Sequence, residues 1–459
     1  MSNGVLLYIM KLKDYLKNCN EVYSTTFDPK NQGVCRLHLV PPEDPKPTTP
    51  WVVIINGYSV IPLQSAWAVL LKEFITTLNS SNVKILDNEN IRYLISTTVK
   101  NAKEVFTTAE ESDLKDDLKD MIRTFRDLAV GKEPSTKIGY MTLKKYSKYM
   151  SAPHRVDLMV SAMEKNGKWN CNQKCLHCYA SGEKVSSYPE LSTSEWKKII
   201  DKLKKARVPA ITFTGGEATV RSDLVELVEY SKWFVTRLNT NGILLTEKLA
   251  KQLYDASLDS VQITLYSSDK EIHNKLVGAD KFDDTVNGIK NAIKAGLDVS
   301  INTPLCSLNK DYLSTVKFAE SLGVRYFSCS GLIPTGNAVK EDSTITRLSK
   351  DEITEVLKKA YDYTYCYNLE ISFTSPGWID EAVLKKLRLV VPSCGACLSN
   401  MAIAPNGEVI PCQSWLYGTS LGNLLNDEWT QIWKNKTCKD IRKTAINKEQ
   451  TCLLKEYRK

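Results

Sequence analysis

The chain has 459 residues, of which 42% are hydrophobic and 25% are charged, which is the composition of an ordinary globular protein. At roughly 100–200 residues per domain, this length predicts two to four domains. The 61 Lys and Arg residues outnumber the 53 Asp and Glu residues, which leaves a formal net charge of +8. So mild an excess excludes a dedicated nucleic-acid-binding surface, and we expect no nucleic-acid partner.

The 13 cysteines are the unusual feature of the composition. Their number is odd, and the N-terminus lacks a basic segment and a small-residue cleavage site, so they do not indicate the disulfide framework of a secreted domain. No segment approaches the roughly 20 apolar residues that a membrane-spanning helix needs. We therefore expect a cytoplasmic protein without a membrane partner, in which clustered cysteines bind metal or carry out redox chemistry.

The first 150 residues contain no cysteine cluster. Two apolar runs, 34–40 and 50–61, flank a Pro-rich turn, and apolar residues then recur at helical spacing over 65–78 and 114–130. Paired strands followed by helices predict a small winged-helix-like module. A polar and basic stretch over 134–155 is typical of a connector.

From about residue 156 to residue 331, strand patterns alternate with helix patterns in six successive units. This alternation predicts βαβ units and a parallel sheet. Six units are too few for a closed eight-fold barrel, so the expected fold is α/β, an open partial (β/α)6 barrel.

Three cysteines stand close together in the loop after the first of these strands: Cys171, Cys175 and Cys178. Thiolates at this spacing suit a cubane iron–sulfur cluster, and three ligands leave one iron open, as in a catalytic metal site. His177 is an alternative fourth ligand. The other alternative, three reduced core cysteines, fits poorly with a polar Asn, Gln and Lys loop.

Further polar motifs follow the next strands, namely TGGE over 214–217, NTNG over 239–242 and SSDKEIH over 267–273. Sites in parallel α/β folds form at the carboxyl ends of the strands, so these motifs should converge with the cysteine loop on one mouth. Gly215 and Gly216 would let the backbone approach a ligand closely. The NTNG residues are equally compatible with a simple turn.

Four segments together carry a resemblance to a known family: CNQKCLHCYA (171–180), TFTGGEATV (212–220), LNTNGILLT (238–246) and QITLYSSDKEIH (262–273). They resemble the radical S-adenosylmethionine (SAM) superfamily, over about residues 154–335. The resemblance implies a 4Fe–4S cluster on Cys171, Cys175 and Cys178, whose open iron is chelated by the amino and carboxylate groups of SAM. Reduction by an external donor such as flavodoxin or ferredoxin would then give methionine and a 5′-deoxyadenosyl radical, which abstracts a substrate hydrogen.

The same resemblance assigns roles to residues around the cluster. It implies that Gly215, Gly216 and Glu217 bind the methionine amino group, and that Asn239 and Asn241 contact the ribose or the carboxylate. Tyr179 is expected to pack beside the cluster. Thr264 lies where many relatives have the Ser of a Ser-Leu-Asp motif, and a role in binding the cosubstrate is assigned to it by that position. The residues Thr264 and Tyr266 themselves depart from the motif.

The C-terminal region resembles the SPASM/Twitch extension of this superfamily, on Cys394, Cys397, Gly407, Cys412 and the segment SLGNLL that follows. PNGE over 405–408 predicts a hairpin turn between MAIA and VIPC. The extension implies one auxiliary 4Fe–4S cluster on Cys394, Cys397 and Cys412, with Cys452 as the expected fourth ligand and Cys438 as the alternative. The reading that these cysteines are merely buried stays open, and the remaining thiols at 306, 329 and 366 are expected in the core.

The expected domains are a leader-peptide recognition module with its linker over 1–150, the barrel over 151–345 and the auxiliary domain over 346–459. The resemblance implies a maturase that installs a thioether or carbon–carbon cross-link in a ribosomally made precursor peptide with a leader. Two alternatives remain, a dehydrogenase acting on a small metabolite and a maturase acting on a Cys or Ser of a partner protein. Residues 1–150 could also be a packing or dimer module.

Overall fold

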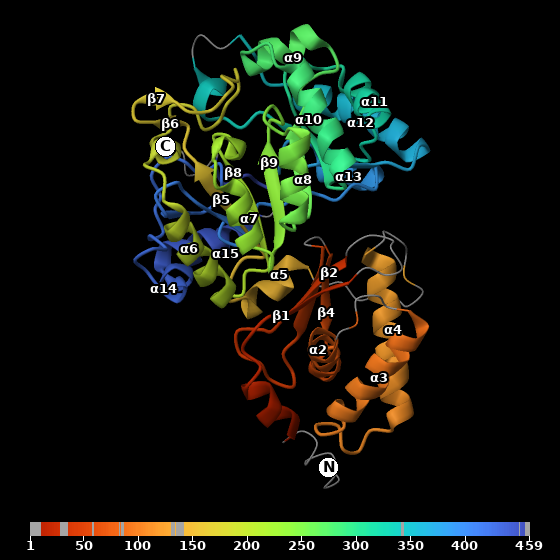
Figure 1. The fold of residues 1–459 in the computed structure, drawn as a ribbon. Coiled ribbons are helices and arrows are strands. Elements are labelled where there is room, and N and C mark those ends of the chain that lie inside the picture. The colour runs from red at the N-terminus through yellow and green to blue at the C-terminus, as the bar shows by residue number, and fades with distance from the viewer. Residues whose placement is uncertain are drawn as a thin grey trace. The chain divides into compact units, whose positions relative to one another are not determined.

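The computed structural model describes residues 11–27, 35–56, 59–81, 83, 87–129, 134, 142–340, 344–448 and 450–454. Its contacts divide the chain into two compact units. Unit 1 comprises Met1–His154 with Lys204–Pro209, and unit 2 comprises Arg155–Leu203 with Ala210–Lys459. Figure 1 traces both along the chain. In the described part of the chain, no helix is long and apolar enough to cross a membrane.

Unit 1 is a four-stranded antiparallel meander followed by three helices. The strands, paired in the order β1-β2-β3-β4, are β1 (Tyr23–Phe27), β2 (Cys35–Val40), β3 (Trp51–Ile55) and β4 (Ser59–Leu63). The helices are α2 (Ser65–Ser80), α3 (Asn88–Ala102) and α4 (Glu111–Ala129), and the short α5 (Leu143–Tyr146) and η2 (Ser147–Tyr149) come later in the chain. The expected strand pair is a sheet of four for two reasons: the apolar run that begins at residue 50 forms both β3 and β4, and β1 lies outside the two runs.

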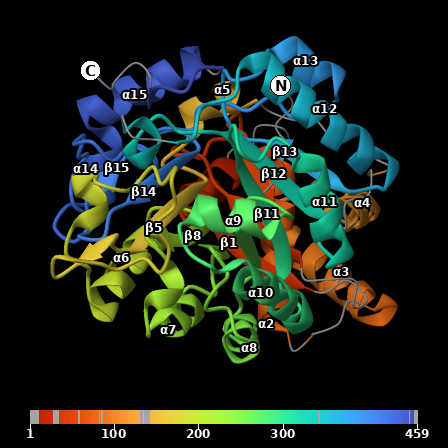
Figure 2. The same cartoon turned by 90° about the horizontal axis from the view of Figure 1, so that it is seen from above.

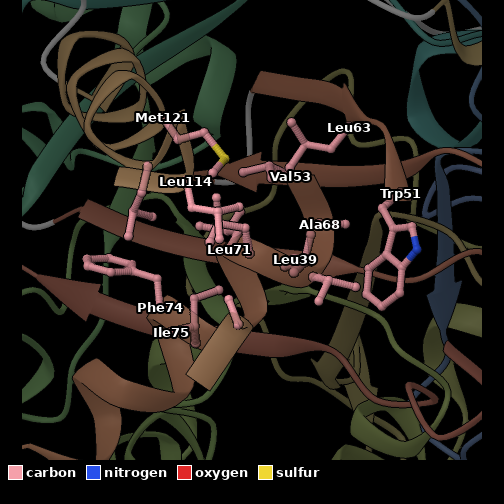
Figure 3. Packing of buried hydrophobic residues seen from close by; sticks show 14 of the residues in the cluster. Leu39, Trp51, Val53, Leu63, Ala68, Leu71, Phe74, Ile75, Leu114 and Met121 are labelled. Atoms are coloured by element: carbon pink, nitrogen blue, oxygen red, sulfur yellow. The ribbon is translucent and has the colours of Figure 1, made fainter. Parts of the chain in front are cut away.

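The core of unit 1 forms where the sheet meets its helices. Strand β3 is buried along its whole length, and Trp51 and Val53 belong to the same apolar cluster as Leu71 and Phe74 of α2 and Met121 of α4 (Figure 3). Burying this much apolar surface is the main stabilising term available to a small unit. Unit 1 therefore has a core of its own.

Unit 2 is built on one nine-stranded sheet in the order β13-β12-β11-β10-β9-β8-β5-β14-β15. Its parallel strands are β5 (Arg155–Ser161), β8 (Ala210–Gly215), β9 (Val235–Thr240), β10 (Ser260–Thr264), β11 (Asp298–Leu305), β12 (Tyr326–Gly331) and β13 (Glu370–Phe373). The order is linear rather than closed, and this confirms the open partial barrel. Strand β13 is one more parallel strand than the sequence indicated.

Helices cover the outer face of the curved sheet, as seen from above in Figure 2. They are α6 (Thr193–Lys205), α7 (Leu224–Tyr230), α8 (Glu247–Asp255), α10 (Phe282–Ala295), α11 (Tyr312–Ser321), α12 (Lys350–Cys366) and α13 (Glu381–Lys386). Helix α9 (Lys270–Val277) lies instead at the carboxyl end of the strands (Figure 2). Burial alternates along β11, where Val299 and Ile301 are buried while Ser300 and Asn302 are partly exposed. The apolar residues therefore face the helices and the polar ones face the concave side.

The C-terminal region joins the same sheet. Strand β14 (Asn400–Ile403) pairs in parallel with β5, and β15 (Val409–Ile410) pairs antiparallel with β14, which confirms the hairpin predicted from PNGE. Gly407 in its turn has a φ of +88°, a conformation that favours glycine. The remaining elements are β6 (Glu164–Lys165), β7 (Lys168–Trp169), η3 (Lys184–Ser187), η4 (Ala218–Val220), η5 (Gly336–Val339), α14 (Trp429–Lys434) and α15 (Lys436–Asn447).

Candidate functional site

The loops that follow β5, β8 and β9 meet at the carboxyl ends of these strands. The Asn241 side-chain amide donates to the Asn172 side-chain oxygen at 2.6 Å, and the Cys171 thiol lies 3.6 Å from the carbonyl oxygen of Gly216. These contacts join the cysteine loop, the GGE motif and the NTNG motif. The convergence expected from the motif positions is therefore present in the structure.

Glu217 is the centre of this arrangement, with only 3% of its surface exposed. Its Oε1 accepts from the Thr219 backbone N–H at 3.0 Å, from the Thr219 hydroxyl at 2.6 Å and from the Thr240 hydroxyl at 2.7 Å. Its Oε2 accepts from the Asn241 backbone N–H at 2.8 Å. A carboxylate oxygen has two lone pairs, so Oε2 retains room for one further donor, such as an ammonium group.

The structure explains why both residues before Glu217 are glycines, which the sequence did not reveal. A Cβ on Gly215 would lie 2.2 Å from the Ser161 carbonyl oxygen, and one on Gly216 would lie 2.9 Å from the Ala162 carbonyl oxygen. Gly215 also has a φ of +140°. The two glycines therefore allow a close approach to the backbone at the end of β5, and their approach to a ligand stays a prediction.

The three cysteines of the loop are partly buried and influence one another. Burial, together with the negative charges of Cys178 and Cys171, raises the pKa of Cys175 well above its usual range. Burial likewise raises the pKa of Cys171 to about 12 and that of Cys178 above its ordinary value. Three thiols in one loop form a soft donor set, which must lose its protons when it binds iron.

In the part of the chain that the structure describes, no three His, Cys, Asp or Glu side chains are placed to hold one metal ion. The thiolates of a 4Fe–4S cluster need not converge on one metal position, because each binds a different iron of the cube.

Other residues predicted for the site lie close by. Tyr179, Cys171 and Cys178 all pack against one apolar cluster of buried residues. His177, weighed as a fourth ligand, has its Nε2 within 2.7 Å of the Tyr266 hydroxyl, and burial lowers its pKa to about 4. Thr264 ends β10 opposite Asn302.

Buried polar atoms that lack a hydrogen-bond partner show whether a polar cosubstrate fits at the carboxyl ends of these strands. Among the described residues, three buried side-chain atoms of the converging loops have no hydrogen-bond partner: Asn172 Nδ2, Asn239 Oδ1 and Asn337 Oδ1. Asn239 belongs to β9 itself and not to the turn after it. Buried polar atoms are normally paired, so one free donor and two free acceptors are consistent with a polar ligand such as SAM.

A second group of cysteines gathers in the C-terminal region. Burial and the charges of Cys394 and Cys452 raise the pKa of Cys412, and burial raises that of Cys397, which donates to the Cys438 sulfur. Cys412 therefore lies within electrostatic range of Cys394 and Cys452, and Cys397 within that of Cys412 and Cys438. Cys366, expected in the core, is exposed at the end of α12, whereas Cys306 and Cys329 are buried as expected.

Sequence reasoning missed several residues that shape these sites. Thr219 and Thr240 hold Glu217, and the segment 335–337 contacts the cysteine loop. The signal that could have found this segment is PTGN, which follows β12 just as TGGE follows β8. At the second group, Arg442 donates to the Cys438 sulfur at 3.2 Å and to the Cys397 carbonyl oxygen at 2.9 Å.

Comparisons with known proteins agree with this geometry. A family model described as the radical SAM superfamily matches residues 170–319, and one described as an iron–sulfur cluster-binding domain, SPASM, matches residues 394–454. The chain is 30% identical over 275 residues to the mycofactocin maturase MftC of Mycolicibacterium smegmatis, which covers 58% of this chain and 68% of that protein. It is 29% identical over 284 residues to an AdoMet-dependent heme synthase of Oleidesulfovibrio alaskensis, covering 58% of this chain and 72% of that protein.

Solved structures share the fold at low sequence identity. Streptococcus suis SuiB bound to its precursor peptide SuiA aligns with a TM-score of 0.57 and 15% identity, over 85% of this chain and 87% of that chain. The anSMEcpe structure with bound AdoMet aligns with a TM-score of 0.52 and 19% identity, over 63% and 83%. The chain therefore belongs to the radical SAM superfamily, with a 4Fe–4S cluster, SAM and an auxiliary iron–sulfur cluster in its SPASM domain as cofactors.

Proposed function

We propose that this enzyme is a peptide maturase, which abstracts a hydrogen from a ribosomally made precursor peptide and installs a thioether or carbon–carbon cross-link. The observation that carries the proposal is unit 1, a separate sheet-and-helix unit with its own core that precedes the radical SAM region. Chemistry on a small metabolite gives no reason for such a unit.

Two relatives support this choice. MftC is named as a maturase, and SuiB was solved with its precursor peptide SuiA. Unit 2 makes up about two thirds of the chain, so the SuiB match, which covers 85%, extends into unit 1. Recognition of a precursor peptide is the task that unit 1 would serve here.

We assign leader recognition to unit 1 and its linker over 1–150, the radical chemistry to 151–345 and the auxiliary cluster to 346–459. Among the described residues, strands β1 and β4 are the two edge strands of this sheet. An extended leader can pair with such an edge by strand addition. The net charge of +8 suits an acidic leader.

In the proposed site, Cys171, Cys175 and Cys178 hold the 4Fe–4S cluster. Glu217 Oε2 accepts from the amino group of SAM, and Asn239 and Asn241 contact its ribose or carboxylate, while Gly215 and Gly216 let the GGE turn lie against β5. When bound and reduced by a donor such as flavodoxin or ferredoxin, the cluster and SAM supply the hydrogen-abstracting chemistry. The protein's own task is to position the target C–H and exclude water.

The test is incubation of the reconstituted enzyme, SAM and a reductant with a short precursor peptide encoded beside its gene. We expect a mass loss of about 2 Da per cross-link, because each new bond removes two hydrogens from the peptide. A precursor without its leader should react poorly. An unchanged full-length precursor, together with 5′-deoxyadenosine formation on a small molecule, would contradict the proposal.

A second candidate is chemistry on a small molecule, which the similarity to AdoMet-dependent heme synthases favours. It predicts that turnover needs no leader and is unaffected when the edges of unit 1 are blocked by proline substitutions. Modification of a Cys or Ser on a folded partner protein is the remaining alternative, and intact-mass analysis of such a partner would detect it.

A further inference from the structure

The segment after β12, Thr335–Gly336–Asn337, binds the backbone of the cysteine loop. The Asn337 side-chain amide donates to the Cys175 carbonyl oxygen at 2.9 Å, and the Asn337 backbone N–H donates to the Cys178 carbonyl oxygen at 2.9 Å. The Thr335 hydroxyl donates to the Tyr179 carbonyl oxygen at 3.0 Å. Three carbonyl groups of the loop are thus held by donors of one short segment that lies far away in the sequence.

Gly336 makes this contact possible. It has a φ of +59°, and a Cβ built on it would lie 2.1 Å from the Cys178 carbonyl oxygen and 2.8 Å from that of Tyr179. No side chain fits at that distance, so the segment can approach the loop only through glycine. Gly182 also has a positive φ, of +76°, but nothing lies within 4 Å of its Cβ position.

The opposite side of the loop is held by the end of α9. The backbone N–H groups of Lys174 and Leu176 donate to the carbonyl oxygens of Val277 and Leu276, at 3.0 and 2.9 Å. The backbone on both sides of Cys175 is therefore hydrogen-bonded, through N–H groups to α9 and through a carbonyl group to Asn337. This fixes where the Cys175 thiol can point.

The orientation of the Asn337 side chain follows from the same contacts. If its amide were turned over, the side-chain oxygen would face the Cys175 carbonyl oxygen, and two acceptors would repel each other. As oriented, Oδ1 is buried and has no partner. Only the N–H donor can face the loop, so the hydrogen bond to Cys175 is the side chain's defined contact.

We propose that Asn337 is a positioning residue, which holds the Cys175–Cys178 backbone in the geometry that retains the radical SAM cluster. Gly336 allows the segment to come close enough for this contact. The inference rests on the proposed assignment of Cys175 and Cys178 as cluster ligands. Groups that orient metal ligands typically change metal affinity 10–100-fold when they are removed. We expect loss of the Asn337 side chain to weaken retention of the cluster by a factor of the same order.

The test compares Asn337→Ala, Gly336→Ala and the control Gly182→Ala in the full, reconstituted chain. We expect a chelator to remove the radical SAM cluster about 10–100 times faster from the Asn337 and Gly336 variants. Their EPR signal on addition of SAM should also differ from that of the unaltered enzyme. The auxiliary cluster in the same molecules is an internal reference, and its rate of loss should not change.

Two results would overturn the proposal. One is an unaltered rate of cluster loss and an unaltered EPR signal in both variants, and the other is equal acceleration for both clusters, which would indicate general destabilisation. Retention of this cluster in Cys175→Ala would refute the ligand assignment itself. None of these readouts uses a peptide, so a failure of the proposed peptide chemistry would be seen separately.

Discussion

Replacing Glu217 with glutamine tests how the GGE motif works. The amide oxygen of glutamine would take the place of Oε1, where three donors converge, so its NH₂ group would take the place of Oε2. There it would face the Asn241 backbone N–H, which now donates to Oε2 at 2.8 Å. Two donors would then point at each other, and the ammonium group of SAM would lose its acceptor.

The magnitudes follow from these contacts. A buried backbone N–H left without an acceptor costs about 1–3 kcal/mol, so Glu217→Gln should lower the free energy of unfolding of the apo chain by that amount. A hydrogen bond to a charged group contributes about 1.5–3 kcal/mol, so its loss should weaken SAM binding roughly 10–150-fold. The two effects are separable because the first needs no ligand.

Urea unfolding of the apo chain measures the first effect, and equilibrium dialysis of SAM against the reconstituted enzyme measures the second. Glu226→Gln is the matched control. Glu226 lies on the neighbouring helix α7 in an exposed ion pair with Lys197, which should contribute little. SAM binding by Glu217→Gln at the affinity of the unaltered enzyme would refute the reasoning, because it would mean that the carboxylate does not meet the amino group.

Further predictions concern the two clusters and unit 1. The reconstituted chain should hold about eight irons, four per cluster, and Cys412→Ala about four in a colorimetric iron assay; eight in the variant would contradict its role as a ligand. Cys452→Ser should lose the EPR signal of the auxiliary cluster and Cys438→Ser should retain it, with the reverse outcome favouring Cys438 as the fourth ligand. Phe74→Ala should destabilise unit 1 by about 3–5 kcal/mol in thermal unfolding, because Phe74 is buried in its core, without changing peptide-independent 5′-deoxyadenosine formation.

The alternating apolar and polar residues of the barrel were sufficient to predict its first six parallel strands, but not β13. Periodicity is a local property, since each strand or helix displays its buried face within a few residues. The same holds for the cysteine spacing and for PNGE, whose turn geometry depends on its own residues. Cys366 was misplaced because it lies off the buried face of its helix α12, which carries Ile353, Leu357 and Ala360 at helical spacing.

The amino-acid sequence by itself thus determined the α/β class, the cysteine loop and the motifs that end the strands. Only the tertiary structure decided which distant groups meet: β14 beside β5, Thr240 and Asn241 on Glu217, Asn337 on the loop, and Cys438 beside Cys397. Such contacts join segments that lie 23 to more than 160 residues apart. They depend on strand order and packing across the whole unit, and no local pattern of residues carries that information.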